Sequence, residues 1–240
     1  MKPDENFWLF TRPIAHRGLW GNGIVENSLT AYKNAADNGY PIEIDLFLTA
    51  DNEIVTFHDD TLTRLTGASG RIYDKTLAEL KTLSLAGTEE KIPTLKEVLA
   101  LVSGRVPLLI EIKDQPNDFV VDIAVEILKN YKGEFALQSF NPFYIKRIKK
   151  IAPDFTRGIL GTHKHEKERG RITNFVLQHL PFNFMIKPDF ISYEKTGLKH
   201  VKRKAKRTPV IAWTVTTEEE KAEALKVAKN IIFEHFVPKK

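Results

Sequence analysis

The chain has 240 residues, of which 42% are hydrophobic and 28% charged, so it can bury a sizeable core and is not a disordered polymer. Its 36 Lys and Arg against 31 Asp and Glu give a net charge of +5, which is mild for this length and does not single out nucleic acid as a partner. The absence of cysteine excludes disulfides and thiolate metal sites, so any metal must bind oxygen or imidazole ligands.

The N-terminal segment lacks the pattern of a secretory signal. It carries Asp4 and Glu5 early and only four consecutive apolar residues, 7–10, whereas a signal has a basic start and a longer apolar core. No apolar run approaches the roughly 20 residues of a transmembrane helix. We therefore expect a cytoplasmic protein that is not stably inserted in a membrane.

Apolar, strand-like runs alternate with segments of helical periodicity along the chain. The expected strands cover 13–16, 41–48, 107–113, 134–138, 156–160, 184–188, 209–215 and 230–233. Helical spacing is clearest in "ENSLTAYKNAADNG", "TLKEVLALVSG" and "DFVVDIAVEILKNYKG", each of which ends at glycine. Eight strands alternating with helices predict a closed (β/α)8 TIM barrel of the α/β class, with an open doubly wound sheet as the alternative.

The stretch after the second expected strand breaks this rhythm. A hairpin-like turn at Asp51-Asn52 is followed by a Gly- and Ser-rich stretch and then by a short helix. We expect residues 61–90 to form a small insertion on a single barrel domain that comprises residues 1–240.

Carboxylates interrupt two of the apolar strands. Alternate side chains of a strand share a face, so "PIEIDLF" places Glu43 and Asp45 together, and "PLLIEIKD" does the same for Glu111 and Lys113. Acids that point into a barrel need a partner, and a hard cation such as Mg²⁺ or Ca²⁺ would supply it. The alternative is that these acids face outward into salt bridges. Polar groups on two such strands favour a site at the carboxyl end of the barrel.

Two histidines follow expected strands. His16 begins the tripeptide His16-Arg17-Gly18 directly after the first strand, and His58 follows the apolar run of the hairpin. Two imidazoles beside acids and an arginine suit acid–base chemistry near neutral pH. His163 and His165 also follow a strand, and we expect them in a solvated loop.

With these residues in order, the chain resembles the glycerophosphodiester phosphodiesterase family, and in particular its short cytosolic bacterial members. The resemblance extends from 16 to about 215 and rests on "HRG", "ENSLTAY", "EIDLFLTADNEIVTFHDD", "LTRLTGASG", "IPTLKEVL", "IEIK", "QSF" and "AWTV". It implies a TIM barrel with a small insertion after the second strand. It also implies metal-dependent hydrolysis of small-molecule glycerophosphodiesters to glycerol 3-phosphate and an alcohol.

The resemblance also implies roles for particular residues. The catalytic pair is His16 and His58. The ligands of one divalent cation, Mg²⁺ or Ca²⁺, are Glu43, Asp45 and Glu111. The residues that bind phosphate, line the pocket or support the site are Arg17, Lys113, Asn27, Gln138, Phe140 and Trp213. Which histidine is the acid stays open, as does the nucleophile, which is either water or a hydroxyl of the glycerol itself.

The chain departs from the family pattern near its end. Members usually carry an aspartate after a "GIIT"-like strand, whereas this chain reads "NIIFEHFVP", with Glu234 as the nearest acid. Thr216 replaces the asparagine that commonly follows "WTV". These changes bear on substrate fit rather than on the metal or the histidines.

Two other functions compete with this interpretation. Lysophospholipase D-like and sphingomyelinase D-like enzymes share these histidines and acids but need an apolar entrance, which "LPFNFMI" could supply, although we expect a buried strand there. A non-enzymatic role would use the basic run "LKHVKRKAKRTP" to bind anionic lipid or nucleic acid. We expect that run to be a solvated helix face, because no aromatic residues are interleaved with its charges. The sequence leaves the head group, the metal and the oligomeric state open.

Overall fold

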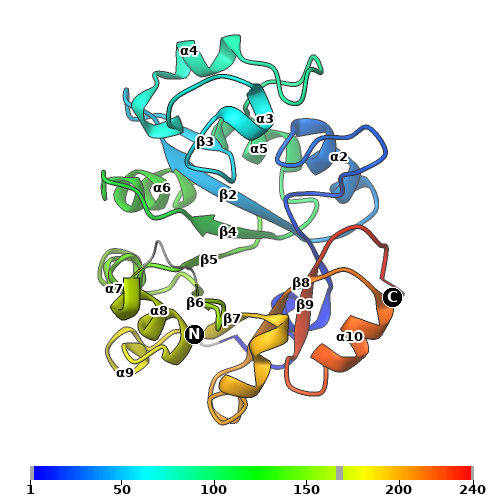
Figure 1. Cartoon of the computed structure of the whole chain (residues 1–240), viewed down its shortest axis with the longest axis vertical. Helices are drawn as coiled ribbons and strands as arrows, with labels where there is room; N and C mark the ends of the chain where they lie inside the picture. The colour runs from blue at the N-terminus through cyan, green and yellow to red at the C-terminus, as the bar shows by residue number, and fades with distance from the viewer. Residues whose placement is uncertain (1–2, 166–169, 239–240) are drawn as a thin grey trace. The chain divides into compact units, whose positions relative to one another are not determined.

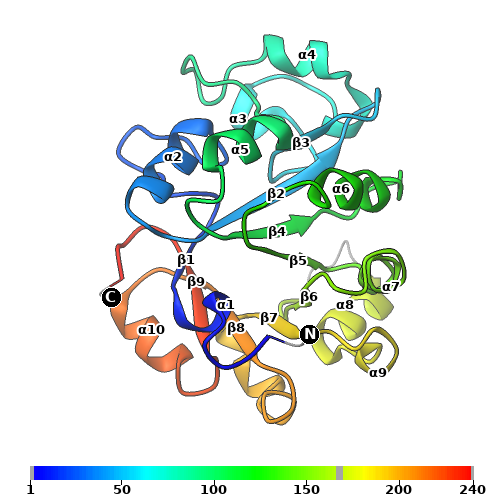
Figure 2. The ribbon, with the colours of Figure 1, turned by 180° about the vertical axis from the view of Figure 1, so that it is seen from behind.

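The computed structural model describes residues 3–165 and 170–238, which form two compact units. We call Ala15–Phe135 the first unit, and Met1–Ile14 together with Ala136–Lys240 the second unit. Figure 1 and Figure 2 show the helices and strands from opposite sides. No helix within the described ranges is long and apolar enough to cross a membrane.

The first unit is built on the buried strand β2. Strand β2 pairs in parallel with β1, where Ala15 lies opposite Ile42, and with β4, where Asp45 lies opposite Glu111, while β3 pairs with it in antiparallel fashion. All residues of β2 and β4 are buried, which fits the Ile- and Leu-rich sequence of strands covered on both faces. The elements are β1 (Ile14–Ala15), α2 (Leu29–Asp37), β2 (Ile42–Leu48), β3 (Ile54–Thr56), α3 (Thr63–Thr66), η1 (Ile72–Asp74), α4 (Leu77–Thr82), α5 (Leu95–Val102), β4 (Leu108–Ile112) and α6 (Val120–Leu128).

The segment between β3 and α5 has a small core of its own. Its buried members come from β2, from β3 and from the segment itself, and they are Phe47, Val55, Phe57, Leu62, Leu65, Ile72, Leu80, Leu85 and Ile92. Helices α4 and α5 both begin with a capping box, in which a threonine and a glutamate three residues later satisfy each other's backbone N–H groups. The insertion predicted after the second strand is confirmed.

The second unit contains five strands that pair in parallel in chain order, β5 with β6, β6 with β7, β7 with β8 and β8 with β9. Helices α7 and α10 begin with side-chain caps from Asn141 and Thr217. The elements are α1 (Trp8–Thr11), β5 (Phe135–Ser139), α7 (Pro142–Ile151), β6 (Arg157–Gly161), α8 (Gly170–His179), α9 (Asn183–Ile186), β7 (Phe190–Glu194), η3 (Lys195–His200), β8 (Val210–Val215), α10 (Glu218–Ala224) and β9 (Asn230–Phe233).

The strand predicted over 184–188 is wrong, because this stretch forms the short helix α9 and the strand follows it as β7. Lys187 ends the helix with a left-handed φ of 48°. Phe184 is exposed, so this apolar run is not buried as a core strand would be. The sequence "FISYE" is instead buried throughout, because β6 and β8 flank it. Apolar content alone does not separate a short helix from a strand.

The basic run also differs from the expected helix. Residues 195–200 form η3, and residues 201–207 continue as successive turns rather than as a regular helix. The other seven predicted strands agree with the structure to within one or two residues. Within the described chain, eight parallel strands alternate with helices, and β3 is the added antiparallel strand. This is the element order of a (β/α)8 TIM barrel, so the predicted fold class is confirmed.

Candidate active site

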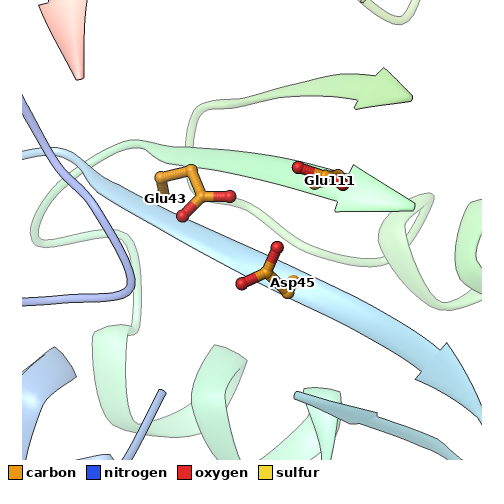
Figure 3. Close-up of side chains that lie close together, drawn as sticks. All are labelled: Glu43, Asp45 and Glu111. Atoms are coloured by element: carbon orange, nitrogen blue, oxygen red, sulfur yellow. The ribbon is translucent and has the colours of Figure 1, made fainter. Parts of the chain in front are cut away.

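Three buried carboxylates meet on one face of the first unit's sheet. Glu43 and Asp45 project from β2, and Glu111 projects from β4 beside Asp45 (Figure 3). One carboxylate oxygen from each lies within 4.8 Å of those of the other two. Burial and the nearby charges of Asp45 and Glu111 raise the pKa of Glu43 well above its usual value. The alternative that these acids face outward into salt bridges is wrong for this acidic cluster.

Two cationic side chains border the acidic cluster. Lys113 Nζ lies 2.8 Å from Asp45 Oδ1 and 2.7 Å from Glu111 Oε1, and Arg17 Nε lies 3.6 Å from Asp45 Oδ2. Burial alone would raise the pKa of Asp45, but the charges of Lys113, His58 and Arg17 outweigh it and hold that pKa far below its ordinary value. Burial likewise lowers the pKa of Lys113, yet Asp45 and Glu111 raise it overall. Asp45 is therefore ionised and Lys113 protonated at neutral pH.

The donor set of the acidic cluster fits a hard divalent cation. Among the described residues, Lys113 and Arg17 are the two cationic side chains that face these three carboxylates directly, and carboxylate oxygens are the ligands that Mg²⁺ and Ca²⁺ prefer. Asp45 Oδ1 is buried, and Lys113 Nζ lies 2.8 Å from it. A carboxylate oxygen has two lone pairs, so it can face this ammonium group and a metal ion at once.

The turn after β1 places the Arg17 backbone against the acidic cluster, and His16 directly precedes it in the chain. Arg17 and Gly18 both adopt left-handed backbone, with φ of 57° and 86°. The Arg17 backbone N–H donates to Glu43 Oε2 at 3.0 Å, and the indole of Trp20 donates to the carbonyl of His16 at 2.9 Å. A Cβ at Gly18 would lie 2.8 Å from the carbonyl carbon of Ala31, so helix α2 leaves room only for glycine.

Asn27 supports the acidic cluster from behind. Its Nδ2 donates to Asp45 Oδ2 at 2.9 Å, and the hydroxyl of Tyr32 donates to its Oδ1 at 2.7 Å. The residue is buried and has a left-handed φ of 53°, a conformation that asparagine tolerates better than most side chains. The amide therefore holds one Asp45 oxygen in place.

A series of charged side chains positions His58. The sequence alone did not identify this series. His58 Nδ1 lies 2.6 Å from Asp59 Oδ1, and Arg64 Nε donates to Asp59 Oδ2 at 2.5 Å. Arg64 also donates to both oxygens of Glu26, which accepts from Arg17 Nη1 as well. Burial would raise the pKa of Asp59, but hydrogen bonds from His58 and Arg64 keep it well below its ordinary value. The signals in the sequence were the adjacent acid in "HDD" and the arginine in "LTRLTG".

The remaining predicted residues, Gln138, Phe140 and Trp213, lie in the second unit. Gln138 Oε1 accepts from Ser192 Oγ at 2.6 Å, and the rings of Phe140 and Trp213 meet edge to face at 5.7 Å. The indole Nε1 of Trp213 is buried without a hydrogen bond to any residue that the structure describes. These three residues belong to the second unit, and the other eight predicted site residues belong to the first unit.

A second polar cluster in the second unit was also missed from the sequence. Glu194 is buried at the end of β7, and its Oε2 lies 2.9 Å from His163 Nδ1 and accepts from Thr196 at 2.7 Å. The His163 ring also stacks on the His200 ring, with the ring centroids 5.6 Å apart. Since His163 contacts both Glu194 and His200, it does not simply lie in a solvated loop as expected. His165 is exposed, as expected.

Glu234 and Thr216, the two positions near the C-terminus that depart from the family pattern, contact residues close to them. The Glu234 backbone N–H donates to the Val215 carbonyl at 3.0 Å, and its Oε1 lies 3.7 Å from His235 Nε2. The Thr216 hydroxyl donates to Glu220 Oε2 at 2.8 Å. These contacts lie within the second unit.

The sequence matches known proteins over nearly its whole length. The pattern of the Glycerophosphoryl diester phosphodiesterase family matches residues 16–239. A Glycerophosphodiester phosphodiesterase of Caldanaerobacter subterraneus subsp. tengcongensis is 32% identical, with 90% of each chain covered. Glycerophosphodiester phosphodiesterase 1 of Homo sapiens is 28% identical, over 87% of this chain and 73% of the human one.

Solved structures are similar as well. A phosphodiesterase of Oleispira antarctica, determined in complex with the product sn-glycerol-3-phosphate, is 27% identical with a TM-score of 0.75, and 92% of each chain is covered. A glycerophosphodiester phosphodiesterase of Thermotoga maritima is 26% identical with a TM-score of 0.70, again over 92% of each chain.

Proposed function

Since the chain belongs to the glycerophosphoryl diester phosphodiesterase family, we propose that it hydrolyses glycerophosphodiesters to sn-glycerol 3-phosphate and an alcohol. The observation that carries this proposal is the buried acidic cluster bordered by Lys113 and Arg17. Such a site combines ligands for a hard cation with donors for phosphate oxygens, which is the combination that phosphodiester hydrolysis requires.

We propose Glu43, Asp45 and Glu111 as the ligands of one divalent cation, either Mg²⁺ or Ca²⁺. When bound, such a cation neutralises charge on phosphoryl oxygens and lowers the pKa of a hydroxyl group. Lys113 and Arg17 stabilise the negative charge that develops on the phosphoryl group, and the planar fork of Arg17 is suited to two phosphate oxygens. Glu26 holds that fork by accepting from Nη1.

His58 and His16 exchange protons with the oxygens on phosphorus. With Nδ1–H of His58 donating to Asp59, the Nε2 atom is left to take or give a proton, and Arg64 keeps Asp59 ionised and oriented. His16 serves on the other side of phosphorus. A phosphorus NMR search for a cyclic glycerol phosphate decides whether the nucleophile is water or the glycerol hydroxyl.

The proposal extends to the rest of the chain. Asn27 holds Asp45, and Gln138, Phe140 and Trp213 are substrate-binding residues of the second unit. Residues 1–240 act as one catalytic domain, the insertion at about 61–90 included. We place the protein in the cytoplasm, with a role in lipid and glycerol metabolism.

Purified protein tests these assignments directly. We expect hydrolysis of glycerophosphocholine or glycerophosphoethanolamine, its loss on exhaustive chelation, and its return with Mg²⁺ or Ca²⁺. His16→Ala and His58→Ala each lower kcat by at least about a hundredfold, because a positioned acid or base contributes roughly 10²–10⁴-fold. The exposed His165→Ala serves as the matched control and leaves kcat unchanged. Full activity after chelation would overturn the metal assignment, and near-normal kcat in either histidine variant would overturn the catalytic assignment.

A further inference from the structure

Helices α7, α8 and α9 of the second unit expose unusually large apolar side chains. Phe143 on α7 is 60% exposed, Ile172 and Phe175 on α8 are 81% and 54% exposed, and Phe184 on α9 is 79% exposed. The other large exposed apolar residues in the described part of the chain are scattered over separate segments. Isolated exposed apolar residues need no explanation, but four on neighbouring helices indicate a binding surface.

The three helices pack against one another as one surface. The rings of Phe143 and Phe182 lie 5.9 Å apart, and Lys149 Nζ on α7 donates to the carbonyl of Met185 on α9 at 3.2 Å. A small apolar cavity is lined by residues of all three helices, among them Pro142, Val176 and Ile186. Both views show α7, α8 and α9 together (Figures 1 and 2). We call residues 142–151 and 170–187 the α7–α9 surface.

The charge of the α7–α9 surface has one sign only. Its two segments contain no Asp or Glu, and their Lys and Arg residues are Lys146, Arg147, Lys149, Lys150, Arg171 and Lys187. All of these except the half-buried Lys149 are exposed. Exposed phenylalanines among basic residues are typical of protein segments that lie on anionic lipid, where rings enter the boundary between head groups and acyl chains. A second copy of this chain is a poor partner, because a two-fold contact would bring the same positive charges together.

We propose that the α7–α9 surface docks the protein reversibly on an anionic lipid bilayer. Phe143, Phe175, Phe184 and Ile172 enter the head-group region, and the basic residues contact lipid phosphates. This inference does not depend on the proposed hydrolysis, because it concerns a surface outside the acidic cluster. It adds reversible attachment to a protein in which no described helix can span a membrane.

Vesicle sedimentation with the full chain tests the proposal. Protein is mixed with phosphatidylcholine vesicles that either lack or contain about one third phosphatidylglycerol, at low and high salt. We expect binding to the anionic vesicles only, weakened by salt because screening reduces the charge attraction. The double variant Phe143→Ser with Phe184→Ser should bind at least about tenfold more weakly, since each ring loses the apolar transfer free energy of a buried side chain.

Two matched controls distinguish binding through this surface from nonspecific adsorption to the vesicles. Phe119→Ser with Leu225→Ser removes apolar side chains that are 63% and 44% exposed on other segments, and it should bind like the parent protein. Lys202→Gln with Arg203→Gln removes two exposed charges from the basic run and should change binding far less than Lys146→Gln with Lys150→Gln. Thermal unfolding checks that all variants fold.

Three results would overturn the proposal. The first is absence of binding to anionic vesicles by the parent protein at low salt. The second is an equal loss of binding in a control variant and in its α7–α9 counterpart. The third is a dimer in light scattering that dissociates in the Phe143→Ser, Phe184→Ser variant, because a second copy would then cover the surface. Hydrolysis of soluble glycerophosphocholine should be the same in all these variants.

Discussion

Replacing Gly18 by alanine tests why glycine follows the His16-Arg17 pair. At a φ of 86° an L-residue costs about 1–2 kcal/mol more than glycine. The new Cβ would also lie 2.8 Å from the carbonyl carbon and 2.9 Å from the Cβ of Ala31, and neither atom can rotate away. Helix α2 must therefore shift, and overpacking of this kind costs about 1–3 kcal/mol. We expect Gly18→Ala to lower the free energy of unfolding by about 2–5 kcal/mol.

Gly23→Ala is the matched control. Its φ of 89° is nearly the same, but no described atom lies within 4 Å of the position that its Cβ would take. This variant should lose only the backbone cost of about 1–2 kcal/mol. Urea unfolding of the two variants at one pH measures the difference. Gly18→Ala should also lower kcat, because the shift moves the Arg17 N–H away from Glu43. Equal losses of stability in the two variants would refute the steric part of this reasoning.

Two further predictions concern carboxylates outside the acidic cluster. Asp59→Asn should lower kcat by about tenfold or more with little change in KM, because His58 loses the group that orients it. The neighbouring Asp60→Asn, which alters an exposed ion pair with Arg71, should have no effect on kcat. Steady-state kinetics that show equal losses of kcat in the two variants would contradict the role of Asp59. Lys195 and Thr216 lower the pKa of Glu220 to about 2, so this carboxylate stabilises the folded state above its unfolded pKa of 4.5 and loses that effect as the pH falls towards 2. Since its side chain is 36% exposed, solvent screening limits the loss in Glu220→Gln to under about 1 kcal/mol at pH 7, and denaturant unfolding should show this gap closing in acid, not widening.

The sequence by itself determined the features that depend on local periodicity. The two-residue period of a strand is a property of the backbone, so Glu43 and Asp45 had to share a face wherever β2 lay. Alternation of apolar runs and helical segments likewise predicted the (β/α)8 order. Short contiguous motifs, those around His16 and His58 among them, carried the family resemblance.

Only the tertiary structure decided which distant groups meet. The parallel register of β2 and β4 places Glu111 opposite Asp45, and pairing of this kind depends on strands far apart in the chain. The link from His58 through Asp59 and Arg64 to Glu26 joins side chains whose separation along the sequence carries no periodic signal. Asn183–Ile186 form a helix with an exposed Phe184, and the strand β7 lies further along the chain, between β6 and β8. Burial against neighbouring strands, rather than apolar content, selects which run becomes a strand.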